Sequence, residues 1–275
     1  MSKVFQSLFQ LNLDKTDFIL YIFSYRYIVT ELEIGTYQDV VNKAYYGPPI
    51  GDCRSQLYQI TNGLAHIHDI GCVHRDLRPH SIRIILPAAI DHQEPILKLS
   101  GFGFSRVRDG QDHFPLTKLA DCDPWFTAPE VCDSEEFTST MDIFSLGCIW
   151  AIALSGDFSH PFGCRNSAIN RIQKRRSINL TLKDFKNVTR EEAELVFALV
   201  RSMLSFTPGV RPTSLDILRH PYFAHLSVKA KDPVTPSSKQ KENGNLTILL
   251  IHLYYFDNIF KLKILFLHRY QPKGR

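Results

Sequence analysis

The segment from Met141 to Leu154 constrains the fold of this chain more than any other. After Asp142 it is almost wholly apolar, so a helix formed here has no polar face to turn toward water. A helix that crosses a bilayer needs about 20 apolar residues, and this run is shorter. We therefore predict a helix that is buried in the core of a globular domain.

A second segment, from Cys53 to Ile70, has the spacing of an amphipathic helix. Its apolar residues recur at steps of three and four, and Gly71 follows as a helix-ending residue. Two short apolar runs, at 82–86 and 96–99, are typical of strands joined by a polar hairpin. These patterns predict a mainly α fold with a few short strands. The other expected elements are a buried strand at 27–32 and helices at 36–44, 191–203 and 214–218.

Charge and cysteine spacing exclude several classes of function. The formal net charge of +4 suits a soluble protein with acidic or phosphorylated partners, and it is too small to indicate nucleic-acid binding. The six cysteines include no C-x-x-C pair, which argues against a zinc site or a disulfide framework and favours a reducing compartment. The N-terminus lacks a signal peptide, because its apolar run at 18–23 is short. We expect a cytosolic location and identify no membrane segment.

The segment His74–Ser81 reads H-R-D-L-R-P-H-S and resembles the catalytic loop of protein kinases. Four further kinase landmarks follow it in the same order along the chain. They are Leu97–Gly103 in place of the D-F-G strand, Ala128–Glu130 as A-P-E, Asp142–Gly147 as the D-x-x-S-x-G helix start, and Arg211 followed by Pro212. This resemblance implies a protein-kinase-like fold, with the C-terminal lobe present and the N-terminal lobe truncated.

The resemblance also implies roles for the catalytic loop. Phosphoryl transfer to a hydroxyl needs a carboxylate that accepts the proton and a cation near the transferred phosphate. Asp76 corresponds to the carboxylate and Arg78 can supply the cation. The family activity is serine/threonine phosphoryl transfer, with ATP and Mg²⁺ as cofactors and a protein as substrate.

Five residues are expected to hold the lobe together. By the same resemblance, Glu130 pairs with Arg211 inside the lobe, and Asp142 holds the backbone of the catalytic loop. Removing one partner of a buried pair costs about 3–5 kcal/mol. His74 and Phe102 are interpreted as packing residues of the core.

A closer resemblance is to the inositol-requiring kinase/endoribonucleases of the unfolded protein response. The runs Tyr27–Leu32, Gly63–His68 and Ser159–Gly163 carry it, together with the catalytic loop, and it covers about residues 27–226. It implies signalling in endoplasmic-reticulum stress, a partner kinase or homodimer, and a full-length protein tethered to that membrane with this domain facing the cytosol.

In this family, Glu31 and Leu32 would be hinge residues whose backbone groups pair with adenine. The chain departs from the family pattern beside that site. Gly101 replaces the metal-binding aspartate and Ser81 replaces the asparagine, so a hard cation loses its usual oxygen ligands. Arg83 stands on the adenine floor, where a guanidinium must leave the pocket or stay desolvated at a cost of several kcal/mol.

A fourth departure lies in the activation segment. Asp123 stands where a threonine is usual, and its negative charge is expected to raise the pKa of one carboxylate of the pair that it forms with Asp76. Ahead of the hinge there is no glycine-rich loop and no V-A-I-K lysine.

We divide the chain into four segments. Residues 1–30 are read as a remnant of the N-terminal lobe, 31–226 as the C-terminal lobe, 227–244 as a polar linker, and 245–275 as an unassigned apolar tail. The tail has three interpretations, which are an amphipathic tail, a poor membrane anchor, or translated non-coding sequence. The third interpretation also explains the irregular sequence of the N-terminus and is slightly favoured.

Three hypotheses for function remain. The first is a kinase-family protein with degenerate nucleotide chemistry, a pseudokinase that acts through protein contacts and keeps Asp76 mainly as a hydrogen-bonding scaffold. The second is a working kinase whose small lobe lies outside this sequence. The third is a truncated gene product with no function of its own. Gly101 discriminates the first two, since a restored small lobe would not restore the metal ligand.

Overall fold

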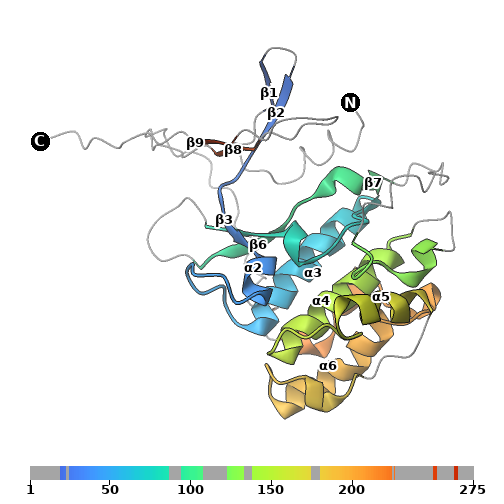
Figure 1. Cartoon of the computed structure of the whole chain (residues 1–275). Coiled ribbons are helices and arrows are strands. Elements are labelled where there is room, and N and C mark those ends of the chain that lie inside the picture. The colour runs from blue at the N-terminus through green and yellow to red at the C-terminus, as the bar shows by residue number, and fades with distance from the viewer. Residues whose placement is uncertain are drawn as a thin grey trace, which may run out of the picture.

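The computed structural model describes residues 19–22, 25–86, 94–107, 123–132, 138–174, 180–224, 226, 250–252 and 263–265. Figure 1 shows a group of helices with short strands above them. The helices are α2 (Tyr37–Val41), α3 (Cys53–Asp69), α4 (Thr140–Ser155), α5 (Arg165–Gln173), α6 (Arg190–Met203) and α7 (Ser214–Leu218). The strands are β1 (Ile19–Ile22), β2 (Tyr25–Thr30), β3 (Glu33–Thr36), β4 (Cys72–Val73), β5 (Ile82–Ile85), β6 (Ile96–Leu99), β7 (Arg106–Val107), β8 (Leu250–His252) and β9 (Lys263–Leu265). The expected mainly α architecture with short strands is confirmed.

Helix α4 lies between α3 and α6 in Figure 1 and is buried along nearly its whole length. Toward α3, the indole Nε1 of Trp150 donates to Thr61 Oγ1 at 3.3 Å. Toward the end of α6, Gly147 lies so close that an added Cβ would be 3.0 Å from side-chain atoms of Met203 and Leu204. The apolar run at the start of our sequence reading is therefore a core helix.

Capping residues mark where the flanking helices begin. Asp52 precedes α3, and its Oδ1 accepts a hydrogen bond from the Ser55 amide at 2.7 Å. Thr189 precedes α6 in a capping box with Glu192, whose carboxylate accepts from the Thr189 amide at 2.9 Å. Both helices start within a residue of the predicted positions.

A three-stranded antiparallel sheet, in the order β3–β5–β6, lies over α3. The hairpin predicted at 82–86 and 96–99 is present, with Ile84 opposite Leu97. Strand β3 was not predicted, because its four residues include a glycine and an irregular pairing step. It leads straight into α2, whose N-cap is Thr36, so the helix predicted at 36–44 is shorter than expected.

A second sheet, in the order β1–β2–β8–β9, lies apart from α4 and α6 in Figure 1. The strand predicted at 27–32 is observed as β2, which ends two residues earlier, at an exposed Thr30. The apolar tail contributes β8 and β9, and Ile28 of β2 stands opposite His252 of β8. The linker predicted at 227–244 lies outside the described residues.

Helix α5 was also missed in the sequence. Arg171 lies in the last turn of α5 and is half-buried, while Lys174 is exposed just after it. In the part of the chain that the structure describes, no helix combines the length and the apolar character needed to cross a bilayer.

Candidate functional site

The catalytic-loop motif lies between β4 and the single-turn helix η1 (Pro79–Ser81). Asp142, at the start of α4, anchors its base. Its carboxylate accepts the backbone amides of His74 at 2.7 Å and Arg75 at 2.8 Å, and one oxygen lies 3.0 Å from Nε2 of His68. These contacts hold Arg75 in a left-handed conformation, with φ of 71°, that a non-glycine residue rarely adopts. The contact expected between Asp142 and the loop is present.

His74 is fully buried and joins the loop to the segment around Gly101. Its Nε2 lies 2.8 Å from the carbonyl oxygen of Ser100, and its Nδ1 lies 3.3 Å from the amide of Asp76. Burial lowers the pKa of His74, so the ring is neutral and donates through Nε2. The ring of Phe102 packs against it with centroids 5.0 Å apart. The two rings thus pack together between the catalytic loop and the Gly101 segment.

Asp76 lies within a chain of alternating charges. Arg78 Nε is 3.3 Å from Asp76 Oδ2, and Arg78 Nη1 is 3.9 Å from Asp123 Oδ2. Arg165, at the start of α5, makes two contacts with Asp123, at 2.8 Å and 3.0 Å. Arg165 was absent from the residues selected in the sequence, because nothing in its spacing connects it to the loop.

Asp76 has a raised pKa, and burial of its carboxyl group is the main cause. The negative charge of Asp123 also raises it, in the expected direction, but as a smaller cause. The positive charge of Arg78 and a hydrogen bond from the Asp123 backbone lower it. The Asp123 carboxylate is itself paired with Arg165.

The two positions that would carry metal ligands meet at the end of this loop. The hydroxyl of Ser81 donates to the Arg78 carbonyl at 2.9 Å and accepts from the Arg78 amide at 3.0 Å. Gly101 has a left-handed φ of 80°, and an added Cβ would lie 3.3 Å from the Ser81 Cβ. Within the described ranges, no three His, Cys, Asp or Glu side chains gather as a metal site would require. These residues do not fit a bound Mg²⁺.

The predicted adenine floor is occupied by ion pairs. Arg83 Nη1 lies 3.0 Å from Glu33 Oε2, and Arg83 Nε donates to Ser100 Oγ at 2.8 Å. Lys98, the cross-strand neighbour of Arg83, approaches Glu31 to 2.6 Å. We expected Arg83 to leave the pocket or to stay desolvated at a cost, and the carboxylate of Glu33 compensates its charge.

The hinge assignment itself rests on position. Glu31 and Leu32 form the connection between β2 and β3, and both are half-buried. The Glu31 carboxylate is engaged by Lys98, which leaves only backbone groups for the adenine contact implied by the resemblance. Glu33 and Lys98 were missed as site residues, since the resemblance assigns a role to neither side chain.

Glu130 and Arg211 form the buried pair that the resemblance implied. Two guanidinium nitrogens contact the two carboxylate oxygens, at 2.5 Å and 2.8 Å. The Arg211 side chain is fully buried and also donates to the carbonyls of Thr140 and Ser205. Its guanidinium lies over the ring of Phe144, 5.1 Å from the centroid. This pair joins the A-P-E segment to the helical core.

Comparisons with known proteins show to which family this chain is similar. A model of the protein kinase domain matches residues 13–223. The serine/threonine-protein kinase/endoribonuclease ire-1 of Caenorhabditis elegans is 31% identical over 204 residues, which cover 72% of this chain and 20% of that protein. The sensor for unfolded proteins in the ER ire1 of Schizosaccharomyces pombe is 25% identical over 282 residues, covering 86% and 26%. Extracellular signal-regulated kinase 1 of Dictyostelium discoideum is 28% identical over 233 residues, covering 76% and 42%.

The chain thus spans about a fifth to a quarter of the first two relatives and less than half of the third. The family model covers the catalytic loop, the A-P-E segment and the core helix together. This chain belongs to the protein kinase family and resembles the kinases of endoplasmic-reticulum stress sensors.

Proposed function

We propose that this chain is a pseudokinase domain that acts through contacts with other proteins in endoplasmic-reticulum stress signalling. One observation carries the proposal. The polar side chains at two positions that would meet ATP and Mg²⁺ are paired with other groups of the chain. Arg83 is paired with Glu33, and the Ser81 hydroxyl is bonded to the backbone of Arg78.

The absent metal ligand has the largest consequence. Phosphoryl transfer depends mainly on positioning and on electrostatic stabilisation by bound cations. Gly101 offers no side-chain oxygen, and the hydroxyl of Ser81 is already used as donor and acceptor. Asp76 would therefore meet a hydroxyl with no phosphate held in line.

Binding of ATP without metal does not depend on the missing metal ligands, because the hinge contacts with adenine are made by backbone groups. We expect ATP to bind weakly through Glu31 and Leu32, if it reaches the hinge past Arg83. The ion pair of Arg83 with Glu33 must then be displaced or accommodated, and this lowers the affinity further.

The second candidate function is serine/threonine phosphoryl transfer from ATP to a protein. One feature favours it. Asp76 is held beside Arg78, and burial raises the pKa of its carboxylate, which suits a proton acceptor. The first proposal extends to a longer protein that contains this domain. We propose that such a protein forms a homodimer and is tethered to the endoplasmic-reticulum membrane, with this domain in the cytosol.

The test uses the purified full chain, first shown to unfold cooperatively. Thermal shifts are measured with ATP in the presence and absence of Mg²⁺, beside a radiolabelled transfer assay on a serine/threonine peptide. We expect no Mg²⁺-dependent shift and no transfer. A Mg²⁺-dependent stabilisation, together with turnover that Asp76→Asn abolishes, would establish the second candidate instead.

A matched variant shows that the assay can detect a metal site. Gly101→Asp combined with Ser81→Asn supplies two oxygen ligands, and aspartate tolerates the left-handed φ at position 101 better than most residues. We expect a Mg²⁺-dependent shift with ATP in this variant and not in the parent.

A further inference from the structure

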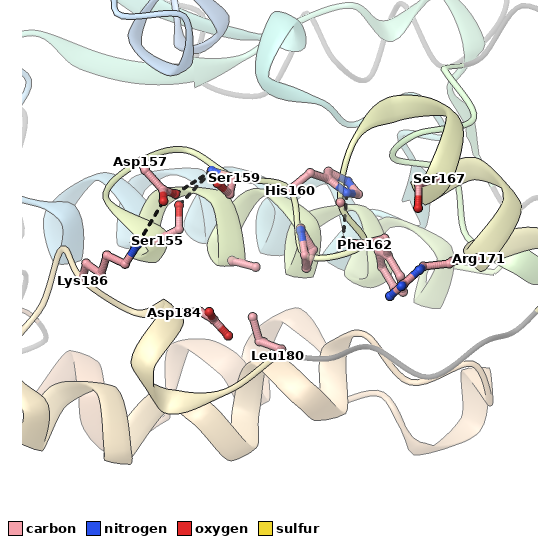
Figure 2. Close-up of a pocket in the computed structure, with 13 residues that line it drawn as sticks. Ser155, Asp157, Ser159, His160, Phe162, Ser167, Arg171, Leu180, Asp184 and Lys186 are labelled. Atoms are coloured by element: carbon pink, nitrogen blue, oxygen red, sulfur yellow. Dashed lines mark hydrogen bonds and ion pairs between the residues drawn. The ribbon is translucent and has the colours of Figure 1, made fainter.

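A pocket of about 310 Å³ lies at the C-terminal end of α4. Figure 2 shows it between the end of α4, the loop around His160, α5, and the segment from Leu180 to Lys186. None of the residues assigned to nucleotide or metal handling lines it. A water molecule occupies roughly 30 Å³ in the liquid, so the pocket has room for about ten non-hydrogen atoms.

Local structure accounts for the shape of the pocket. Helix α4 ends at Gly156, whose left-handed φ of 74° turns the chain outward. The following loop is held by Ser159, whose amide donates to Ser155 Oγ and Asp157 Oδ1. The ring of Phe162, which is buried, forms part of the apolar wall together with Ala151.

Most charged groups around the pocket have partners. Asp157 accepts from Lys186 Nζ at 3.1 Å, so these two charges compensate each other. Asp184 lies on the far side, and its Oδ2 accepts from the amide and hydroxyl of Thr181 at 2.6 Å and 2.9 Å. Burial lowers the pKa of His160 to about 3, so the imidazole is neutral near pH 7.

Helix α5 contributes the exception. Ser167 and Arg171 are four residues apart and therefore lie on the same face of the helix. Both line the pocket, and Figure 2 shows Arg171 reaching toward Phe162. Among the described residues, no hydrogen bond or ion pair is found for the Arg171 guanidinium, which thus has five donors free for a ligand.

We propose that this pocket binds a small carboxylate with an aromatic or aliphatic body. The carboxylate would pair with Arg171 and accept from Ser167, and the body would lie against Phe162 and Leu180. A guanidinium favours carboxylates because two of its N–H groups match both oxygens. Asp184 opposes a ligand with a second negative charge at the far end.

The probe is phenylpropionate, compared with phenylpropionamide, which has the same body and no charge. Binding to the full chain is measured by saturation-transfer NMR titration. For a ligand of this size we expect a Kd on the order of a millimolar for the acid and at least about tenfold weaker binding for the amide. Arg171→Gln should weaken the acid about tenfold and leave the amide unchanged.

Lys174→Gln is the matched control, because it removes the same charge from an exposed site just beyond the same helix. It should bind the acid as the parent does. Equal binding of acid and amide by the parent chain would overturn the proposal. So would equal weakening by Arg171→Gln and Lys174→Gln, since this would indicate only a general effect of net charge. Ser167→Ala, expected to weaken the acid about threefold, keeps the test independent of any loss of fold in the arginine variant.

Discussion

The two ends of the catalytic-loop region differ in what their polar residues contact. At the base, Asp142 holds backbone amides of the loop, and Glu130 pairs with Arg211 as kinase resemblance implied. At the nucleotide end, Arg83 pairs with Glu33, and Ser81 bonds to its own loop. The polar residues at the base thus hold the lobe together, while those at the nucleotide end contact other groups of the chain.

The two ends also differ in burial. A buried charge that loses its partner strongly destabilises the folded state. The pair of Arg83 and Glu33 is more exposed than the pair of Arg211 and Glu130, and water compensates an exposed charge that loses its partner. The comparison therefore predicts large losses of stability for substitutions at the base and small ones at the nucleotide end.

The largest effect is expected from Arg211→Met. It leaves the Glu130 carboxylate without its cation and removes donors from the carbonyls of Thr140 and Ser205. We expect the free energy of unfolding, measured by urea denaturation, to fall by about 3–5 kcal/mol. Arg190→Met is the control, because Arg190 is exposed and its ion-pair partner among the described residues is the exposed Glu194. No measurable change is expected there, and equal losses in the two variants would refute the contrast.

Asp142→Asn tests the anchor of the loop with a smaller change in shape. One side-chain NH₂ would face a backbone amide of His74 or Arg75, so a buried donor loses its acceptor. The free energy of unfolding should fall by about 2–3 kcal/mol. A loss well below 1 kcal/mol, on the scale of exposed pairs, would show that the loop keeps its conformation without this anchor.

His160 makes the stability of the helical lobe sensitive to acid. Its pKa of about 3 in the folded chain lies below the value of about 6.5 in the unfolded chain, so protonation favours unfolding. The stabilisation is complete above about pH 6.5 and is lost as the pH falls toward 3.

Between about pH 7 and pH 5, the contribution of His160 to the free energy of unfolding should fall by about 2 kcal/mol. His160→Phe preserves ring packing against Trp125 and should reduce the pH dependence by that amount. Urea denaturation at both pH values measures it. An unchanged slope in the variant would mean that the imidazole is solvated and titrates normally.

The smallest effect is expected at the nucleotide end. Arg83→Leu removes an ion pair whose two side chains are partly exposed, and we expect a loss of about 1 kcal/mol or less. Because leucine restores an apolar floor, the thermal shift with metal-free ATP should increase. Glu33→Gln breaks the same pair without changing the adenine floor. It should therefore lower the stability as much as Arg83→Leu does, without increasing the thermal shift with ATP.

Much of the fold could be predicted from the chain itself. The apolar run of α4 and the three- and four-residue spacing of α3 identified both helices, because burial on one face or on all faces produces its own periodicity. Strand β3 and helix α5 were missed, because a four-residue strand with a glycine and a helix rich in polar residues produce no such pattern.

For the candidate site, the residue types at motif positions determined which contacts the base would make and which ligands the metal positions lack. The sequence also indicated that the charge of Arg83 would be costly on the adenine floor. Only the tertiary structure decided that Glu33 compensates this charge and that Arg165 neutralises Asp123. The physical reason is that ion pairing depends on distance in space, and the packing of α5 and β3 brings together residues that no spacing along the chain connects.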